Sequence, residues 1–514
     1  MFPLKYITIA FIAVATVCML PKQAASQSNF KKRVTNPIVN SDKDGKQITR
    51  FSTFGDAVDA HDGEIALFND VYYLYGTSYD CGFEWGNKTA PFCGFKTYTS
   101  TDMVNWTDRG FLFDATTSVW QTRCDGKTYG CFRPHVIFNK KTDLYILWIN
   151  VYDNVSGYRV FTSKNPTGPF KEVAEPKLTV NSDAPAGGLN NGDHDTFVDD
   201  DGTAYLVYTD WRTQGSLIVE KLTDDYLTGT GQLVKSVTNG KTEAPGMFKR
   251  NGMYYVVYSD PNCGYCSGTG AAYKTAPSPL GPWSEAKRIS DNSCGGQPSF
   301  VSTIKIGNNT IYLFGSDLWN NAAKNEALAN YYWAPLTFAA DGSINPLVCE
   351  QAHVIPATNN KVTHNTKEPE FITHCDIKNG IVRSQSFTAS STGILSTINL
   401  TTFKTGYPDA PLQVELYKAN KAGQLIGSLL STISVDESAI GWSAKKVAIR
   451  TKLAVKKGES YCMVIKSGTT KGAYGFAYND TGKPVGVESY SKDGGNSFAI
   501  EQNRVIRFDI RMGK

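Results

Sequence analysis

The sequence has few charged residues and no dense run of one sign. Asp, Glu, Lys and Arg make up 19% of its 514 residues, and the net charge is +4. Charge-driven binding to nucleic acid or to a membrane surface requires a basic patch, and no Lys/Arg cluster provides one. We therefore expect neither partner.

Long apolar runs are absent after the N-terminus. Ile7 to Leu20 are fourteen uncharged residues behind the positive charge of Lys5, and small residues follow at Ala24 and Ser26. This pattern is typical of an export signal, and the run is shorter than the roughly 20 residues of a membrane anchor, the alternative. We expect residues 1–26 to be a signal peptide and the mature protein to be secreted, extracellular and monomeric.

Ten cysteines follow this segment, an even number that indicates disulfides in an exported chain. Cys263-Gly-Tyr-Cys266 has no second CxxC and no His pair beside it, so a loop disulfide is a better interpretation than a redox or zinc site. The other expected disulfides close two short loops or join two domains: Cys81–Cys93, Cys124–Cys131 and Cys349–Cys375. Six glycosylation sequons begin at Asn87, Asn105, Asn154, Asn308, Asn399 and Asn479.

One theme repeats through residues 55–351: a short apolar strand, a polar turn and a Tyr-rich strand, with no helical pattern between them. The Tyr-rich strands are expected at residues 71–75, 144–148, 204–208, 253–258 and 311–314. A strand-built repeat of roughly 50 to 70 residues is typical of propeller blades. The sequence predicts an all-β protein that begins with a five-bladed β-propeller after a lead-in at residues 27–54.

The composition changes near residue 352. Residues 352–379 have little hydrophobic pattern and are expected to be a linker. Residues 380–514 contain alternating strands without the blade period, at 412–417, 446–449, 461–465 and 505–510. This pattern predicts a β-sandwich accessory domain, with either a stabilising or a weak glycan-binding role.

The sequence lacks the motifs of peptidases and nucleotide-binding enzymes: it has no Ser/His/Asp elbow, no Walker loop and no HExxH. Three acids instead precede Tyr-rich strands at comparable places, namely Asp62, Asp193 and Glu243. A propeller brings the starts of its innermost strands to one axial pocket. Acids gathered there would raise one another's pKa, as glycosidic cleavage by one protonated acid and one ionised base requires.

The segments 62–76, 193–208 and 243–259 resemble the three signature blocks of glycoside hydrolase family 43, and the resemblance covers residues 55–350. It implies inversion, with Asp62 as the general base, Asp193 as the modulator of the pKa of the acid, and Glu243 as the general acid. A register error of two residues would put Asp195 in the place of Asp193.

Gln297 stands where the family often has a His that binds water or calcium. With His61, Arg133 and the segment 333–336, it resembles the branch that contains exo-β-1,3-galactanases. Members of that branch can lack the base and hold the water with the Gln. This chain keeps both Asp62 and Gln297, and it has Phe132 where that branch tends to have Glu, so galactan specificity stays open.

Five further side chains have a functional and a structural interpretation. Gln297, His61, Arg133, His194 and Trp211 are candidates for substrate binding. Gln297 could instead satisfy backbone groups, the two histidines could make structural hydrogen bonds, and Arg133 could pair with a carboxylate. Trp85, Trp120, Trp211 and Trp319 are expected in loops, where a ring can stack on a sugar or pack between blades.

These observations lead to one main hypothesis. The chain is expected to be an exo-acting, inverting glycoside hydrolase of plant cell-wall polysaccharide, such as an exo-β-1,3-galactanase. An α-L-arabinofuranosidase or β-xylosidase of the same fold and a non-catalytic carbohydrate-binding propeller are the alternatives. No cofactor is expected; calcium on the propeller axis is compatible with the fold but has no distinct ligand motif.

Overall fold

The computed structural model describes residues 35–42, 44–84, 90–124, 130–151, 157–173, 175–179, 191–260, 268–306, 308–319, 325–356, 371–479, 486–502 and 504–513. The predicted signal peptide, Trp85 and the Cys263–Cys266 segment lie outside these ranges. Among the described residues, no helix is both long and apolar enough to cross a membrane.

The first part of the chain forms five antiparallel sheets of consecutive strands. Sheet one has β2 (His61–Phe68), β3 (Val71–Thr77), β4 (Phe95–Ser100) and β5 (Thr107–Phe111). Sheet two has β6 (Cys131–Asn139), β7 (Leu144–Val151), β8 (Tyr158–Ser163) and β9 (Lys171–Glu172). Sheet three has β10 (Asn191–Val198), β11 (Ala204–Asp210), β12 (Ser216–Leu222) and β13 (Gly229–Val234). Sheet four has β14 (Glu243–Arg250), β15 (Met253–Asp260), β16 (Gly270–Ala276) and β17 (Lys287–Ser290). Sheet five has β18 (Gln297–Ile306), β19 (Asn309–Leu318) and β20 (Asn330–Pro335).

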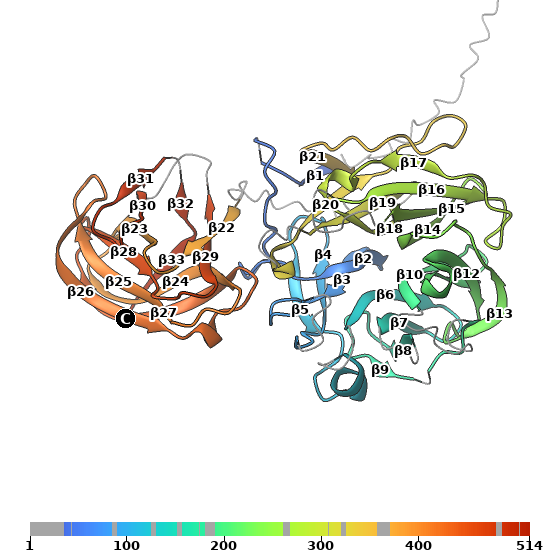
Figure 1. Cartoon of the computed structure of the whole chain (residues 1–514), viewed down its shortest axis with the longest axis horizontal. Helices are drawn as coiled ribbons and strands as arrows, with labels where there is room; N and C mark the ends of the chain where they lie inside the picture. The colour runs from blue at the N-terminus through green and yellow to red at the C-terminus, as the bar shows by residue number, and fades with distance from the viewer. Residues whose placement is uncertain are drawn as a thin grey trace, which may run out of the picture.

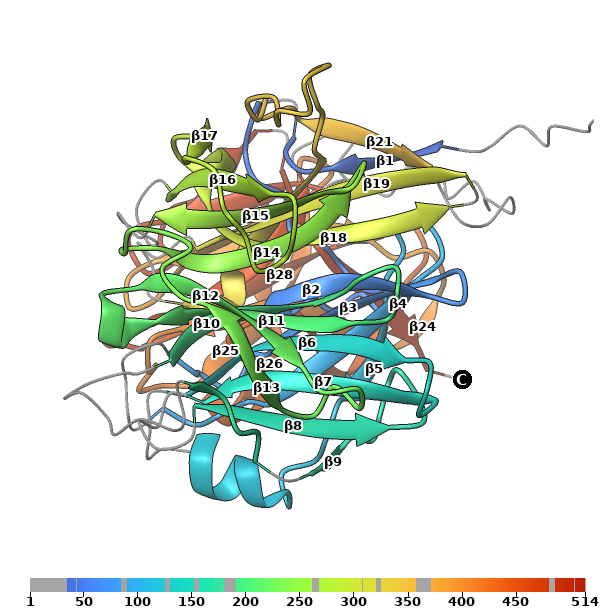
Figure 2. The ribbon, with the colours of Figure 1, turned by 90° about the vertical axis from the view of Figure 1, so that its right-hand side faces the viewer.

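These sheets are the blades of a propeller. Their first strands, β2, β6, β10, β14 and β18, each contact the first strand of the next sheet, and β18 contacts β2. The Tyr-rich segments form the second strands β3, β7, β11, β15 and β19, as predicted. Figure 2 shows the sheets of β6–β9, β10–β13 and β14–β17 in succession. The ring brings the starts of five strands to one axis.

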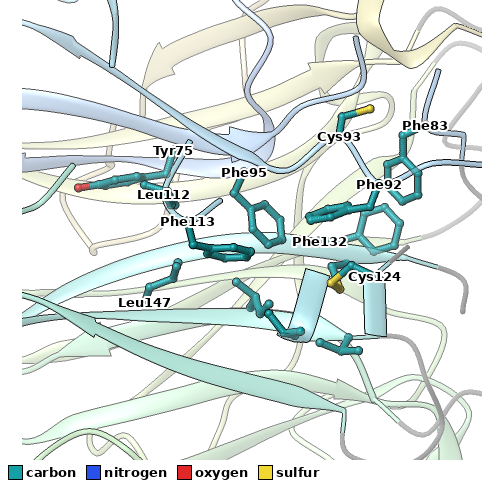
Figure 3. Packing of buried hydrophobic residues seen from close by; sticks show 14 of the residues in the cluster. Tyr75, Phe83, Phe92, Cys93, Phe95, Leu112, Phe113, Cys124, Phe132 and Leu147 are labelled. Atoms are coloured by element: carbon teal, nitrogen blue, oxygen red, sulfur yellow. A yellow bond between two sulfur atoms is a disulfide. The ribbon is translucent and has the colours of Figure 1, made fainter. Parts of the chain in front are cut away.

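Aromatic side chains pack between the blades (Figure 3). Phe113, which follows β5, stacks on Phe161 of β8 with ring centroids 4.7 Å apart and an angle of 2° between the rings. Phe95 of β4 meets Phe113 edge to face at 5.8 Å. Stacked and edge-to-face ring pairs contribute about 0.5–1.5 kcal/mol beyond the area they bury, so this cluster holds the first blade against the second.

The second part of the chain forms two six-stranded sheets, left of the propeller in Figure 1. The first contains β22 (Phe371–Ile377), β29 (Ala473–Asn479), β24 (Gly393–Thr405), β27 (Lys445–Val455), β32 (Val505–Ile506) and β33 (Phe508–Met512). The second has the order β26 (Leu425–Val435), β25 (Leu412–Ala419), β28 (Ser460–Lys466), β23 (Val382–Thr388), β30 (Glu488–Ser491) and β31 (Ala499–Glu501). Apolar side chains of both sheets form one shared core, which is the predicted sandwich.

Two parts of the predicted linker are strands. Residues 352–356 form β21 (Ala352–Pro356), which pairs with β1 (Thr35–Val39) of the lead-in, and β22 begins at Phe371. The pairing of β1 with β21 joins the two ends of the propeller segment. The short helical turns are η1 (Trp120–Cys124), η2 (Trp211–Thr213), η3 (Ser293–Gly295), η5 (Glu326–Leu328) and η6 (Glu437–Ala439).

Two predicted disulfides are present and one was predicted wrongly. Cys81 is bonded to Cys93, and Cys124 is bonded to Cys131. Cys349 is bonded to Cys294 of η3 and not to Cys375. Cys375 lies in β22 of the sandwich as a free thiol, and Cys462 of β28 is a buried free thiol. The spacing of Cys349 and Cys375 suggested their pairing, but the chain before β21 bonds to β17 at Leu347 and to β20 at Val348, between the blades that η3 and its Cys294 connect.

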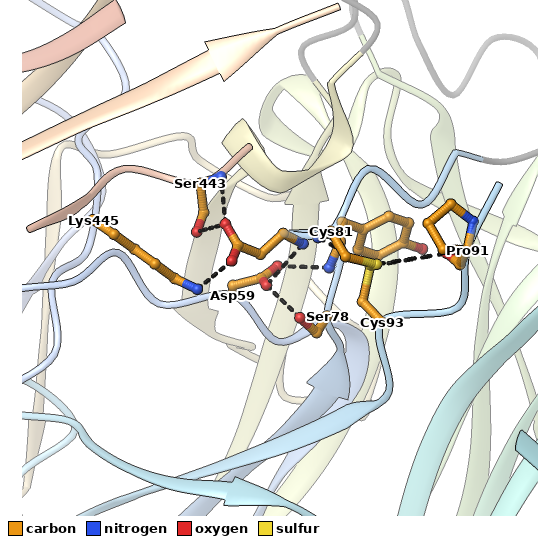
Figure 4. The surroundings of a disulfide bond; sticks show 9 residues. Asp59, Ser78, Cys81, Pro91, Cys93, Ser443 and Lys445 are labelled. Carbon is orange, nitrogen blue, oxygen red and sulfur yellow. Dashed lines mark hydrogen bonds and ion pairs between the residues drawn. A yellow bond between two sulfur atoms is a disulfide. The ribbon is translucent and has the colours of Figure 1, made fainter. Parts of the chain in front are cut away.

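The segment before β27 of the sandwich contacts the loop after β3 of the propeller (Figure 4). Ser443 donates to Asp80 Oδ1 from its backbone N–H at 2.8 Å and from its hydroxyl at 2.5 Å, and Lys445 pairs with Asp80. The Trp442 N–H donates to the Asp80 carbonyl at 3.1 Å. These contacts attach the sandwich to the loop that the Cys81–Cys93 disulfide closes.

Candidate active site

Each inner strand of the propeller has an irregular register near its start. The shifts lie between His61 and Glu64, Phe132 and His135, Asn191 and His194, Glu243 and Gly246, and Pro298 and Phe300. A β-bulge re-aims the side chains beside it, and bulges are frequent next to active sites. Each predicted acid lies at the bulge of its own strand. Glu243 directly precedes the bulge of β14, whereas Asp62 and Asp193 lie within the bulges of β2 and β10.

Asp62 is buried at the start of β2 and has a positive φ of 54°. Its Oδ1 accepts from the Thr77 hydroxyl at 2.7 Å and from the Arg133 N–H at 3.2 Å, and its Oδ2 accepts from the Tyr79 hydroxyl at 2.8 Å. Burial raises the pKa of Asp62 to about 6, although the Arg133 charge and the two hydroxyls oppose the rise.

Arg133 links three blades around this acid. Its guanidinium donates to Asp193 Oδ2 at 2.8 Å and to the Ser299 carbonyl at 3.0 Å. Asp193 Oδ2 also accepts from the Ala244 N–H, beside Glu243, at 3.2 Å. Both side chains are largely buried. Of the two alternatives for Arg133, the structure therefore has the carboxylate pair.

Glu243 is the first residue of β14 and faces neutral donors. Its Oε2 accepts from Gln297 Nε2 at 3.1 Å, and Gln297 Oε1 accepts from Trp319 Nε1 at 3.2 Å. Burial, and next the negative charge of Asp193, raise the pKa of Glu243 to about 8, against the opposing effects of Arg133 and Gln297. The pKa values of the two acids are thus both raised, that of Glu243 more than that of Asp62.

His61 is completely buried behind Asp62. Its two ring nitrogens lie 3.5 Å from Asp59 and 3.5 Å from Asp317, and the ring stacks on Tyr331 at 4.9 Å. Burial lowers the pKa of His61, but the two carboxylates outweigh it and raise the value to about 9. The geometry favours the structural role for His61 over direct contact with substrate.

His194 is also completely buried. Its ring packs against His135 and Tyr158, each with centroids 5.2 Å away. Burial, followed by the positive charges of His135 and Arg133, lowers the pKa of His194 well below its usual value. A neutral, enclosed imidazole fits the structural alternative better than a sugar contact.

A second layer of polar groups lies beneath the acids. His135 Nδ1 is 3.0 Å from Asp195 Oδ1 and 3.7 Å from Glu64 Oε2, and the donor atoms of all three lie within 4.8 Å of one another. Asp195 also accepts from the Met247 N–H at 2.6 Å. Such a donor set could coordinate a cation. Burial lowers the pKa of His135, but the two acids outweigh it and raise the pKa above its usual value. The three side chains contact one another directly, and we assign no metal to the cluster.

The contacts of Asp195 show which of the two acids of β10, Asp193 or Asp195, lies beside Glu243. Asp195 binds His135 in the second layer, whereas Asp193 binds Arg133 beside Glu243. The structure therefore places Asp193, and not Asp195, next to the predicted acid.

Trp211 is the first residue of η2, directly after β11. A side-chain carbon at Gly192 of β10 would lie 2.8 Å from its indole nitrogen, so the ring covers the start of the strand that carries Asp193. This nitrogen is buried and makes no hydrogen bond among the described residues, which keeps Trp211 a candidate for sugar contact. Trp120 packs in the interblade core, and Trp319 lies beside His61.

The partners that hold the predicted residues were not predicted from the sequence. Thr77 and Tyr79 bind Asp62, and Asp317 Oδ2 accepts from the Asp62 N–H at 2.9 Å. Strand register is the signal that could have found two of them, because Thr77 pairs with His61 and Asp317 pairs with Gln297. The end of each second strand thus lies opposite the start of the first.

A five-bladed propeller with titratable carboxylates from three blades at its axis has the architecture of the propeller glycoside hydrolases. The sequence profile of the glycosyl hydrolases family 43 matches residues 57–334, more than half of the chain. The chain belongs to this family, and the family prediction is confirmed.

Individual relatives are more distant. The β-D-galactofuranosidase xynD of Aspergillus niger is 28% identical over 235 residues, which are 44% of this chain and 64% of that protein. The arabinoxylan arabinofuranohydrolase of Bacillus subtilis is 25% identical over 343 residues, 59% of this chain and 65% of that protein. The chain thus spans just under two thirds of the length of these curated relatives. An exo-β-1,3-galactanase structure from Clostridium thermocellum shares the fold, with a TM-score of 0.52 and 21% identity over 81% of this chain and 87% of the other.

Proposed function

We propose that this chain is a secreted, monomeric glycoside hydrolase that removes sugars from the ends of plant cell-wall polysaccharide with inversion. One observation carries the proposal: buried acids from separate blades meet around Arg133, and the pKa values of Asp62 and Glu243, about 6 and about 8, differ in the sense that the reaction needs. Two carboxyl groups whose surroundings separate their pKa values are the usual acid/base pair.

In this mechanism Glu243 donates its proton to the leaving glycosidic oxygen. Asp62 removes a proton from the attacking water, and Thr77 and Tyr79 hold the carboxylate in one orientation. Asp193 keeps Glu243 protonated through its negative charge. Gln297, held by Trp319, positions Glu243 and the water or a ring hydroxyl.

The sugar is the open part of the proposal. We propose β-1,3-galactan as the preferred substrate, because the segments at Gln297 and Arg133 resemble those of the exo-β-1,3-galactanase branch. The names of the relatives add β-D-galactofuranosides and arabinoxylan to the substrates worth testing. The three disulfides among the described residues support an extracellular location.

Sugar release from β-1,3-galactan, arabinan, xylan and an aryl β-D-galactofuranoside tests the proposal. We expect one polymer to be shortened from its end by the wild type, and Glu243→Gln to lose about 10²- to 10⁴-fold in rate. Glu285→Gln, an exposed change on the same blade, is the control. NMR of the first product should show the inverted anomer. A retained anomer contradicts inversion. Binding without cleavage by the wild type supports the alternative of a non-catalytic carbohydrate-binding propeller.

A further inference from the structure

Within the described part of the chain, no sheet packs on the outer face of the second sheet of the sandwich. Leu416 of β25 and Met463 of β28 point into the core shared with the other sheet. Their sequence neighbours Glu415, Tyr417 and Val464 face the opposite way, because successive side chains of a strand alternate between its faces. A groove is hollowed into this outer face.

The groove has a volume of about 490 Å³, which lies within the ~300–1,000 Å³ range of ligand sites. A row of cross-strand neighbours forms its floor. Ser384 of β23 pairs with Ser489 on one side and with Val464 on the other, and Val464 pairs with Glu415. The floor therefore crosses the four inner strands of the sheet, and the edge strands β26 and β31 add Leu425 and Ile500 to the lining.

Two loops form the walls, and both are held by internal hydrogen bonds. In the β25–β26 turn, the Asn420 amide donates to Gln424 Oε1 at 2.9 Å and accepts from the Gln424 N–H at 3.0 Å. In the loop after β30, Asp493 accepts from the Ser497 N–H at 3.0 Å and from the Ser491 hydroxyl at 2.6 Å. A groove with fixed walls loses little entropy when a ligand binds.

The lining combines rings, apolar floor and uncharged polar groups. Tyr417 and Phe498 pack on the apolar cluster that contains Val464. Gln424 and Asn496 are exposed amides at the rim. The two charges of the lining cancel, because Lys466 Nζ lies 2.6 Å from Glu415 Oε1.

This lining selects among ligand classes. Because Lys466 and Glu415 neutralise each other, the lining has no net charge and does not attract a strongly anionic or cationic polymer. A peptide that adds a strand would need a free sheet edge, and this groove crosses the face. A sugar ring offers C–H faces to aromatic rings and hydroxyl groups to amides, so it matches both halves of the lining.

We propose that this groove binds a neutral polysaccharide chain, in extended contact with Tyr417, Phe498, Gln424 and Asn496. The inference rests on the proposed function for the identity of the polymer, the one that the propeller shortens. A second site on the same chain raises the effective concentration of the polymer at the first, since the second contact becomes intramolecular.

Binding is measured in the full-length Glu243→Gln background, so that the polymer is cut far more slowly than by the wild type. Affinity electrophoresis in gels with β-1,3-galactan, arabinan or xylan gives the apparent Kd. Adding Tyr417→Ala or Phe498→Ala should weaken binding to one polymer by about tenfold, as loss of an aromatic anchor does. The exposed change Gln424→Ala should weaken it less and does not affect the core. Leu429→Ala, an exposed apolar residue of β26 outside the groove, is the control.

Hydrogen exchange separates this groove from the propeller pocket. With saturating polymer, we expect slower exchange in residues 412–425 and 489–500 as well as near Glu243. Protection confined to the propeller, or equal affinity in the Tyr417, Gln424 and Leu429 variants, overturns the proposal, as does binding of denatured casein in place of every polysaccharide. Groove-dependent binding with no hydrolysis by the wild type keeps this proposal and overturns the proposed function.

Discussion

Asp62 of the propeller and Asp376 of the sandwich have different hydrogen-bond partners. In the sandwich, Asp376 accepts hydrogen bonds from Arg383 and lies 3.2 Å from His374. Burial opposes the change, but the side-chain hydrogen bonds with His374 and Arg383 and the positive charge of Arg383 hold the pKa of Asp376 well below its usual value. In the propeller, the atoms that donate directly to Asp62 are hydroxyl groups and a backbone N–H, and burial raises its pKa to about 6.

This comparison separates a structural acid from a reactive one. A direct cationic partner fixes a carboxylate in its ionised form over the whole physiological range, so the group cannot exchange a proton as a general acid or base. Neutral donors orient the carboxylate but leave its proton exchangeable near neutral pH, as acid/base catalysis requires. The same replacement, Asp to Asn, should therefore have opposite consequences in the two domains.

Asp62→Asn should have the largest effect of these variants. It should lower the activity without lowering the stability. Without an ionisable group at this position, the attacking water loses its base, and we expect the rate of sugar release to fall by about 10²- to 10⁴-fold. The folded-state pKa is raised, so ionised Asp62 destabilises the native protein at pH 7, and the neutral side chain should leave the Tm unchanged or higher. Polymer hydrolysis and calorimetry measure the two effects. A lower Tm with retained activity would place Asp62 among the structural acids.

Asp376→Asn should give the reverse result. Loss of the carboxylate beside Arg383 should lower the free energy of unfolding of the sandwich by about 1.5–3 kcal/mol, the range for a hydrogen bond with a charged group. Chemical denaturation followed by far-UV circular dichroism measures it, with Asp436→Asn as the control, because Asp436 is exposed and its side chain makes no capping hydrogen bond to η6. Sugar release from a short substrate should stay near the wild-type rate, and a loss like that of Asp62→Asn would break the distinction.

The contact between the domains should have an intermediate effect. Asp80→Asn keeps the size of the side chain but removes its ion pair with Lys445 and weakens the bonds from Ser443. We expect a loss of about 1–2 kcal/mol, smaller than a fully buried charge pair because Lys445 is partly exposed. Calorimetry should show the lower-melting domain unfolding earlier. Asp143→Asn, an exposed turn acid of the second blade, should leave both transitions in place.

The sequence allowed the strand repeat, the blade count and the three acids to be predicted, because each depends on local patterns. The Tyr-rich strands mark every blade, and Asp62 and Glu243 stand at strand starts. The sequence could not show that Asp193 binds Arg133, since the two residues come from different blades. The Cys294–Cys349 disulfide was missed for the same reason: its two ends are 55 residues apart and are brought together by the blade between them.

The partners of Asp62 offer the finest test of the comparison. Activity should follow a bell-shaped pH profile, with an acidic limb near pH 6, where Asp62 must lose its proton, and a basic limb near pH 8, where Glu243 must keep its own. The Tyr79 hydroxyl lowers the pKa of Asp62 by donating to its ionised form. Tyr79→Phe should therefore raise this pKa and move the acidic limb to higher pH, by up to about one unit for a hydrogen bond of ~1 kcal/mol.

Tyr75→Phe is the matched control for this shift. The Tyr75 hydroxyl donates to the Pro166 carbonyl at 2.7 Å, away from the acids, so its removal should leave both limbs in place. The basic limb should not move in either variant, because Tyr79 does not contact Glu243 among the described hydrogen bonds. An acidic limb that moves to lower pH in Tyr79→Phe would mean that the hydroxyl stabilises the protonated acid. Neutral donors would then not be what keeps Asp62 available as a base.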